Sequence, residues 1–366
     1  MDLRSLLALL PFVFLACQAT TPDSSSEETQ PSAATVDTLR KAQEVHLRNV
    51  RQLTFGGDNA EAYWSFDNRK LVFQATNPAW GAACDQIFIM DAQRGAAEQP
   101  PMVSTGRGRT TCAFFLPGDT TILYASTHLA GDECPEAPRV VNGKYVWAVF
   151  PSYDIFIADL QGNILGQLTD HPGYDAEATL SPDGSKIVFT SDRSGDLELW
   201  TMNLDGSELH QVTDELGYDG GAFFSPDGKK LIFRASRPQT EEEVRTYKEL
   251  LAQGLVQPTH MELFVCNVDG SDMRQITNLG GANWAPYFHP SGKKVLFASN
   301  HHSESRRQFN IFAINLDGTG LEQITFDDAF DAFPMFSYDG KYLAFSSNRN
   351  NGGTRSTNVF VAEWVE

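Results

Sequence analysis

Basic residues are scarce in this chain of 366 residues, which has 28 Lys and Arg against 47 Asp and Glu and a formal net charge of −19. A surface of this sign repels phosphate backbones, so the composition argues against a nucleic-acid partner. Cysteine is scarce as well, and five scattered cysteines exclude a disulfide scaffold or a zinc finger. The hydrophobic content of 41% is that of a globular chain with an apolar core.

Long apolar runs are also missing. The run over residues 6–16 has eleven residues, whereas a helix that crosses a bilayer needs about 20. It follows Arg4 and ends just before Cys17, which is typical of the hydrophobic region of a secretory signal peptide. Residues 14–17 (FLAC) resemble a bacterial lipobox, and this resemblance implies that Cys17 is acylated and becomes the mature N-terminus. An ordinary signal peptide followed by a chance cysteine is the alternative.

The chain divides into three expected segments. Residues 1–16 are expected to be a lipoprotein signal peptide, residues 17–47 a flexible tether and residues 48–366 the folded domain. The tether is rich in Ser, Thr, Pro and acidic residues, so it lacks the apolar surface that would offset the entropy of ordering it. Because Gln18 rather than Asp follows Cys17, lipoprotein sorting implies the outer membrane, facing the periplasm or the cell surface. The expected location is therefore the bacterial cell envelope, with the lipid as membrane anchor.

A repeated pattern runs through residues 48–366. Its clearest copy has Gln-Leu-Thr at 167–169, Ser-Pro-Asp-Gly at 181–184, Lys-Ile-Val-Phe at 186–189 and Leu-Asp-Gly at 204–206. Each copy consists of short apolar runs joined by Asp-Gly turns, which indicates consecutive β-hairpins. Six copies with a period of roughly 45 residues match the size of propeller blades. The sequence predicts an all-β, six-bladed β-propeller.

The phase of the repeat predicts how the ring closes. Residues 48–54 have the pattern of the last strand of a unit, yet they precede the first full unit. Residues 358–365 have the pattern of a third strand, and no fourth follows. The N-terminal strand is therefore expected to complete the last blade, which removes two free sheet edges.

These motifs resemble the TolB-like β-propeller repeat family over residues 48–366, although the N-terminal domain of TolB has no counterpart here. The resemblance implies an extracytoplasmic binding module related to TolB of the Tol–Pal transport system. Its partner would be a protein, peptide or glycan of the cell envelope, bound by a monomer. Because fold alone does not determine function, the ligand has to be sought on the loops.

The loops from the fourth strand of one blade to the first strand of the next share a face with the loops between the second and third strands, here called the top face. Aligned units repeat a polar position beside the axis on this face, often next to an aromatic residue. The polar positions are Asn59, Thr110, Asp175, Asp219, Asn283 and Asp331, and the aromatic neighbours include Tyr174, Tyr218 and Trp284. We expect these residues to bind the ligand or partner as an electronegative ring, which would suit Ca²⁺ or an Arg or Lys side chain of a partner. Alternatively, they only cap the channel by bonding backbone groups and water.

Catalytic motifs are absent from the sequence. It has no Gly-x-Ser-x-Gly, no His-Glu-x-x-His and no phosphate-binding loop. Several histidines nevertheless fall on top-face loops, and oligogalacturonate lyases share this repeat type and bind a metal through histidines on one face. A metal-assisted polysaccharide lyase is therefore the alternative function, with His260, His301 and His302 as possible ligands. Their spacing does not reproduce that of the lyases, so no catalytic residue is assigned and binding is favoured.

Three cysteines, Cys84, Cys112 and Cys134, fall on top-face segments of the first two blades. Outside the cytoplasm one pair of them can form a disulfide, and Cys112, the nearest to both others in sequence, is the expected member. Cys266 lies in an apolar strand and is expected to be a buried free thiol.

Overall fold

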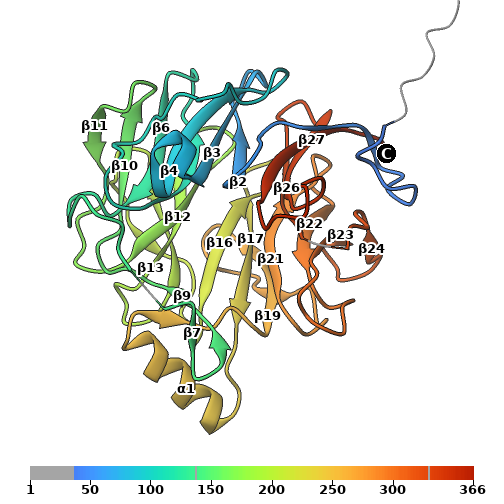
Figure 1. Cartoon of the computed structure of the whole chain (residues 1–366). Helices are drawn as coiled ribbons and strands as arrows, with labels where there is room; N and C mark the ends of the chain where they lie inside the picture. The colour runs from blue at the N-terminus through green and yellow to red at the C-terminus, as the bar shows by residue number, and fades with distance from the viewer. Residues whose placement is uncertain (1–36, 137, 329) are drawn as a thin grey trace, which may run out of the picture. The chain divides into compact units, whose positions relative to one another are not determined.

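The computed structural model describes residues 37–136, 138–328 and 330–366, which form six sheets arranged as the blades of a β-propeller (Figure 1). Five blades have four strands each, and blade one has three. Met102 pairs with Phe88 along the outer edge of blade one, in the place of a fourth strand. The predicted six-bladed fold is confirmed. No helix of the described residues is long and apolar enough to cross a membrane.

The strands of the first three blades follow the chain from axis to rim. Blade one contains β2 (Asp58–Trp64), β3 (Lys70–Asn77), the 3₁₀ turn η1 (Pro78–Trp80) and β4 (Ala82–Asp91). Blade two contains β5 (Thr110–Phe115), β6 (Thr121–Ser126), β10 (Asp154–Asp159) and β11 (Ile164–Gln167). Blade three contains β12 (Asp175–Leu180), β13 (Lys186–Ser191), β14 (Glu198–Asn203) and β15 (His210–Gln211).

The remaining blades repeat this order. Blade four contains β16 (Asp219–Phe224), β17 (Lys230–Ser236), β19 (Met261–Asn267) and β20 (Arg274–Gln275). Blade five contains β21 (Asn283–Phe288), β22 (Lys294–Ser299), β23 (Asn310–Asn315) and β24 (Glu322–Gln323). Blade six contains β25 (Asp331–Phe336), β26 (Tyr342–Ser347), β27 (Asn358–Trp364) and, as its outermost strand, β1 (Leu47–Gln52).

Strand β1 closes the ring, as the phase of the repeat predicted. It pairs antiparallel with β27, with Leu47 opposite Trp364 and Gln52 opposite Phe360. Residues 37–46, which the sequence placed in the tether, form turns before this strand. Glu44 among them is fully buried and bonds to Arg349 of blade six. The ordered contact with the propeller thus begins ahead of the closing strand.

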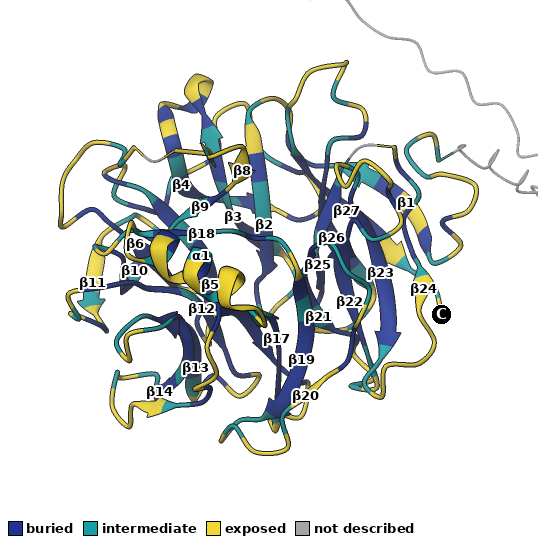
Figure 2. Ribbon diagram, turned by 90° about the horizontal axis from the view of Figure 1, so that it is seen from below, coloured by how far each residue is buried: buried dark blue, intermediate teal, exposed yellow. Residues whose placement is uncertain are grey.

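An aromatic side chain at the same place in the second strand of every blade forms the core between the sheets. These residues are Phe73, Tyr124, Phe189, Phe233, Phe297 and Phe345, each at most 1% exposed. Full burial of each such ring stabilises the fold by about 1.5–3 kcal/mol. Buried strands and exposed turns alternate around the ring accordingly (Figure 2).

The Ser-Pro-Asp-Gly segments form the tight turns between first and second strands. In blade three Ser181 Oγ donates to Asp183 Oδ1 at 2.6 Å, and Gly184 adopts a φ of 73°. Hydrogen bonds from Ser181 and Ser185 lower the pKa of Asp183 to about 2. The motif is therefore explained by turn geometry, and it marks the face opposite the top face.

Two insertions between second and third strands form a projection that we call the cap. Blade two contributes β7 (Val140–Val141), β8 (Lys144–Tyr145) and β9 (Trp147–Ala148), while blade four contributes α1 (Glu241–Leu251) and β18 (Leu255–Val256). Strands β9 and β18 pair antiparallel, so the two insertions meet. The cap lies at the lower side in Figure 1 and crosses the middle of the ring in Figure 2. It covers the top face over the channel.

Candidate functional site: the capped central channel

The six polar residues predicted to form a ring lie at the start of the innermost strands, and each is 0% exposed. Asp175 binds Arg193 Nη2 at 2.7 and 2.8 Å, Asp331 binds Arg349 at 2.8 Å, and Asp219 binds Arg237. Asn59, Thr110 and Asn283 bond within the protein to Gly56 O, Asp85 O and Ser299 Oγ at 2.7–2.9 Å. The expected electronegative ring at the mouth is therefore corrected, because each carboxylate is buried and neutralised inside its own blade.

A second ring of residues, two positions further along each innermost strand, lines the channel instead. Its members are Glu61, Cys112, Glu177, Gly221, Ala285 and Phe333, which all have a left-handed backbone with φ between 44° and 58°. In every blade the pairing register shifts at this point, so two residues lie opposite one. Such a β-bulge redirects a side chain, and six equivalent bulges form what we call the channel ring.

Two of the charged side chains of the channel, Glu177 and Arg234, form an ion pair. Glu177 accepts hydrogen bonds from Tyr218 Oη at 2.7 and 2.8 Å and from Thr190 Oγ1 at 2.8 Å, and it binds Arg234. Burial alone would lower the pKa of Arg234, but Glu177 and Tyr218 together raise it above its usual value. This pair is electrically neutral.

The arginine reaches the channel because blade four has glycine in the channel ring. A Cβ atom on Gly221 would lie 2.0 Å from Arg234 Nη1, so any other residue at this position would displace the guanidinium from its place. Gly221 also needs its freedom for a φ of 58°. The second strand of blade four thus supplies the cation of the channel ring.

Glu61 is the second carboxyl group of the channel ring, and it has no cation in contact with it among the described residues. Tyr63 Oη and Cys112 Sγ both donate to Glu61 Oε2 at 3.1 Å. Burial raises the pKa of Glu61, and the two hydrogen bonds only partly oppose this. Burial likewise raises the pKa of the Cys112 thiol well above its usual range. Burial therefore disfavours the ionised form of both groups.

Aromatic side chains form the walls and floor of a cavity of about 170 Å³. Its walls include Tyr174, Trp284 and Trp147, the last contributed by the cap, and the two Trp rings lie 5.1 Å apart. The floor is an aromatic layer in which the rings of Tyr63 and Phe114 are 4.4 Å apart and those of Phe223 and Tyr287 5.1 Å apart. The channel is therefore a pocket closed below by this layer.

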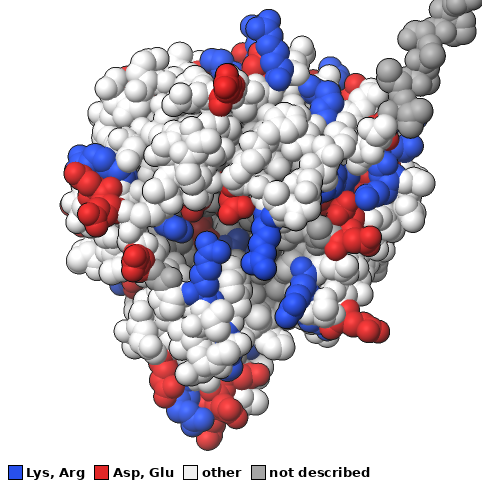
Figure 3. Space-filling model, viewed as in Figure 1, with Lys and Arg blue, Asp and Glu red and all other residues white. Residues whose placement is uncertain are grey.

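Arg234 also contacts the aromatic walls of the cavity through its guanidinium. Its guanidinium lies 5.4 Å from the ring of Trp147 and 5.4 Å from that of Tyr218, within the range of a cation–π interaction. The site is thus aromatic and charged rather than purely apolar. Figure 3, which has the view of Figure 1 with the cap at the lower side, shows charged side chains of both signs around a separate hollow in the face turned to the viewer.

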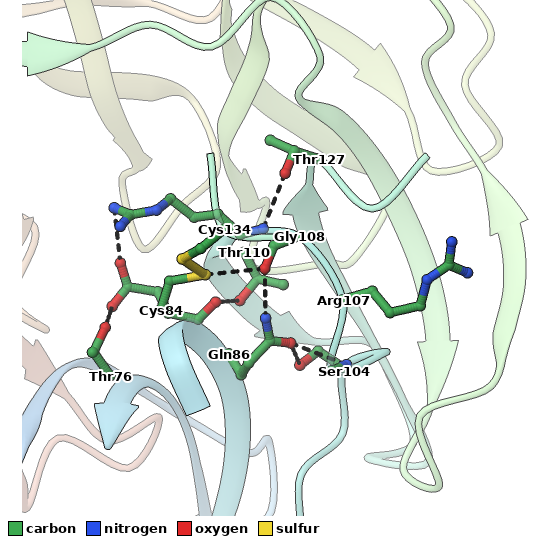
Figure 4. The surroundings of a disulfide bond; sticks show 12 residues. Thr76, Cys84, Gln86, Ser104, Arg107, Gly108, Thr110, Thr127 and Cys134 are labelled. Atoms are coloured by element: carbon green, nitrogen blue, oxygen red, sulfur yellow. Dashed lines mark hydrogen bonds and ion pairs between the residues drawn. A yellow bond between two sulfur atoms is a disulfide. The ribbon is translucent and has the colours of Figure 1, made fainter. Parts of the chain in front are cut away.

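A disulfide holds the cap-bearing insertion of blade two. Cys84, in β4 of blade one, is bonded to Cys134, and their Cα atoms lie 5.9 Å apart (Figure 4). The expectation that Cys112 would be a member is wrong, because its strand is innermost and its thiol faces Glu61. Cys266 is a buried free thiol, as expected.

The three histidines considered as metal ligands do not form one site. His301 and His302 lie side by side in blade five, where they bond to Ser299 and Asn310 respectively. His260 lines a different cavity, beside α1. Among the described residues no group of three or more His, Cys, Asp and Glu is arranged to hold a metal. The channel offers two carboxylates, one of them bound to Arg234, where Ca²⁺ takes six to eight oxygen ligands.

The repeats match a known protein family. The TolB beta propeller domain model matches residues 150–253 and 249–355, more than half of the chain. The chain belongs to this family. As a TolB-type propeller it is similar to a putative TolB from Agrobacterium tumefaciens, with 18% identity and a TM-score of 0.56, covering 87% of this chain and 97% of that one.

Two further solved structures share the fold of this TolB-type propeller. TolB from Acinetobacter baumannii matches with 17% identity and a TM-score of 0.51, covering 84% of this chain and 64% of that one. A gluconolactonase from Xanthomonas campestris matches with 13% identity and a TM-score of 0.56, covering 89% and 93%. At these identities the likeness shows the fold alone.

The structure brings together the aromatic part of the predicted site in this TolB-type propeller. Tyr174 and Trp284 line the cavity, and Tyr218 bonds to its ion pair. The channel ring, Arg234 and Trp147 were not among the site residues predicted from the sequence. A usable signal was present in the aligned repeats. Two residues after the polar position, blades one, two and three have Glu61, Cys112 and Glu177, which are the ionisable members of the channel ring.

Stability should depend on pH through Glu198, which is 2% exposed beside Asp219 near the top face. Burial, with Asp219 second, raises its pKa to about 8 from an ordinary 4.5. Between these values the unfolded chain releases a proton that the folded chain keeps, so the free energy of unfolding falls as pH rises and levels off above pH 8.

We expect the free energy of unfolding of Glu198→Gln to fall less between pH 4 and pH 9 than that of the wild type, by about 2–4 kcal/mol. Urea unfolding should show the variant equal to the wild type near pH 4 and more stable at pH 9. Glu208→Gln, at a side chain 73% exposed on the same blade, serves as the control. Parallel pH curves for the wild type and Glu198→Gln would contradict the assignment.

Proposed function

We propose that this TolB-type propeller is a binding module of the bacterial cell envelope that recognises a protein or peptide partner at its capped top face. The observation that carries the proposal is the meeting of two insertions, as β9 and β18, over a cavity that has aromatic walls and is closed at its far end. Cavities that are mostly apolar, with a few convergent polar groups, are the usual form of a ligand site. A simple spacer would need neither the cap nor the cavity.

The membrane anchor is a second part of this proposal. Acylated Cys17 would hold the propeller at the membrane, and the residues between Cys17 and Asp37 would let it reach a partner. Residues 1–36 lie outside the described part of the chain. The lipobox-like residues 14–17 support the anchor, and mass spectrometry of the mature N-terminal peptide tests it.

Binding rather than catalysis fits the chemistry of the cavity. Its thiol, Cys112, has a pKa raised by burial and donates to Glu61, so it lacks the thiolate character that a nucleophile needs. Glu177 is held by hydrogen bonds from Tyr218 and by its ion pair with Arg234. These residues hold a rigid surface without a group poised to attack a substrate.

Affinity capture from the native envelope tests the proposed face. We expect Trp147→Ala, in the cap, to lower recovery of the wild-type partner at least tenfold, because a buried aromatic anchor often dominates an interface. Tyr338→Ala is the matched control, since Tyr338 is 43% exposed in a turn on the opposite face. Equal losses in both variants, or no loss in Trp147→Ala, would contradict recognition at the cap.

A further inference from the structure

The channel ring holds two carboxyl groups, Glu61 and Glu177, but only one arginine lies in contact with either of them among the described residues. Glu177 is paired with Arg234, whereas Glu61 receives only the hydroxyl of Tyr63 and the thiol of Cys112. Glu61 Oε1 has no hydrogen-bond partner among the described residues, and it is not one of the fully enclosed atoms. Withdrawing a carboxyl group from water disfavours its ionised form unless a cation lies beside it, so a bound cation at Glu61 would stabilise the carboxylate that burial disfavours.

The walls of the cavity suit an organic cation. The face of Trp147 already holds the guanidinium of Arg234 at 5.4 Å, and Tyr174, Trp284 and Phe333 supply further rings around the space. Aromatic faces attract cations most strongly where water is excluded. The apolar stem of an alkylammonium or alkylguanidinium would also cover ring surface that a bare metal ion leaves exposed.

The size and depth of the cavity limit what enters it. Its volume of about 170 Å³ is below the range of about 300–1,000 Å³ that is usual for ligand pockets. The aromatic layer of Tyr63, Phe114, Phe223 and Tyr287 closes the far end. One extended side chain therefore fits from the cap side, while a folded segment of polypeptide does not.

We propose that the channel binds the cationic end of a Lys or Arg side chain of the partner, with its charge at Glu61 and its stem against Trp147 and Trp284. The proposal rests on the proposed function, because the partner supplies the side chain. The net charge of −19 would speed the approach of a basic segment at low ionic strength.

Three small molecules of matched shape test the charge requirement. We expect butylammonium to bind saturably, whereas 1-butanol and butyrate bind at least tenfold more weakly. The two Trp rings in the wall allow intrinsic fluorescence to report binding, with titration calorimetry as the independent measurement. N-acetyl-lysine amide and N-acetyl-arginine amide then represent the side chain in a peptide, and both should bind at least as well as butylammonium.

Glu61→Gln keeps the volume of the side chain and removes its charge. We expect it to weaken butylammonium binding at least tenfold, while Glu198→Gln, a buried carboxylate of blade three outside the cavity, leaves it unchanged. If Glu61→Gln fails to fold, Trp147→Leu provides the test, with an expected loss of about fivefold. Near-UV circular dichroism establishes that each variant keeps its packing.

Specific outcomes would overturn this inference. Equal binding of butanol and butylammonium would show a merely apolar pocket, and unchanged binding in Glu61→Gln would remove the carboxylate from recognition. Stoichiometric displacement of butylammonium by Ca²⁺ would replace the organic cation with a metal. A partner captured through Trp147 but indifferent to Glu61→Gln, together with no amine binding, would sink this inference and leave the proposed function standing.

Discussion

A chain that begins at residue 53 is expected to lose the folded ring, not merely one edge strand. Strand β1 pairs with β27 along blade six and buries Leu47 and Val50, which are 0% and 5% exposed. Burial of two such side chains contributes about 3–6 kcal/mol, and the hydrogen bonds to β27 add to it. Domain stabilities are about 5–15 kcal/mol in all, so the loss removes much or all of the margin.

Urea unfolding and limited proteolysis of the truncated chain measure this effect. We expect either no cooperative transition or a midpoint far below that of a chain beginning at residue 37, which keeps β1 and the turns before it. The chain beginning at residue 37 is the control for removal of the preceding residues. A truncated chain as resistant to protease as this control would contradict closure by β1.

The fold could be predicted from the sequence because its signals are local and repeated. Ser181, Asp183 and Gly184 build their turn from neighbours in the chain, and the same motif recurs wherever the same turn is needed. The closing strand was expected at residues 48–54 and lies at Leu47–Gln52. Counting strand types along the repeats was sufficient for this, since a ring leaves only one place for an extra strand.

The channel ring was harder to predict because it depends on β-bulges. A regular strand would put residues 59 and 61 in equivalent environments, but the bulge separates a fully buried Asn59 from a Glu61 that lines the cavity. Only Gly221 suggests the left-handed backbone from its residue type. The other five ring members adopt it against their own preference, which a sequence pattern does not reveal.

The repeats do contain a sequence signal for the ion pairs formed by the Asp residues at the repeated polar position. Each Asp at the repeated polar position, as in Asp175 and Arg193, is followed 18 residues later by Arg, whereas Asn283 is followed at that distance by His301. The acidic residue and the basic residue change together from blade to blade. Reading the repeats for such pairs would have shown that the carboxylates are neutralised and not offered to a ligand.

Replacing Arg349 with Met is expected to be among the most destabilising single substitutions in the described residues. Its side chain is 3% exposed and binds two fully buried carboxylates, Glu44 at 2.9 and 3.1 Å and Asp331 at 2.8 Å. Removing one partner of a buried ion pair costs about 3–5 kcal/mol, because the remaining charge is uncompensated. Here two carboxylates, Glu44 and Asp331, lose their cation, and the contact between the N-terminal turns and blade six is lost as well.

A comparison with blade three isolates the contribution of Glu44. Arg193→Met strands only Asp175, and its arginine is 14% exposed, so we expect a smaller loss in urea unfolding than for Arg349→Met. The triple variant Glu44→Gln, Asp331→Asn, Arg349→Met should recover much of the loss, since no buried charge is left unpaired.

The pH dependence gives the sharper test of the same triad. Burial already raises the pKa of Asp331 above its ordinary value even with Arg349 present. Without the arginine that pKa must rise further, so Asp331 stays protonated in the folded chain at acidic pH, where its burial costs least. The deficit of Arg349→Met should therefore be smallest near pH 4, grow as pH rises toward the raised native pKa of Asp331, and level off above it. A deficit that is constant from pH 4 to pH 8 would mean that lost packing, rather than stranded charge, governs this contact.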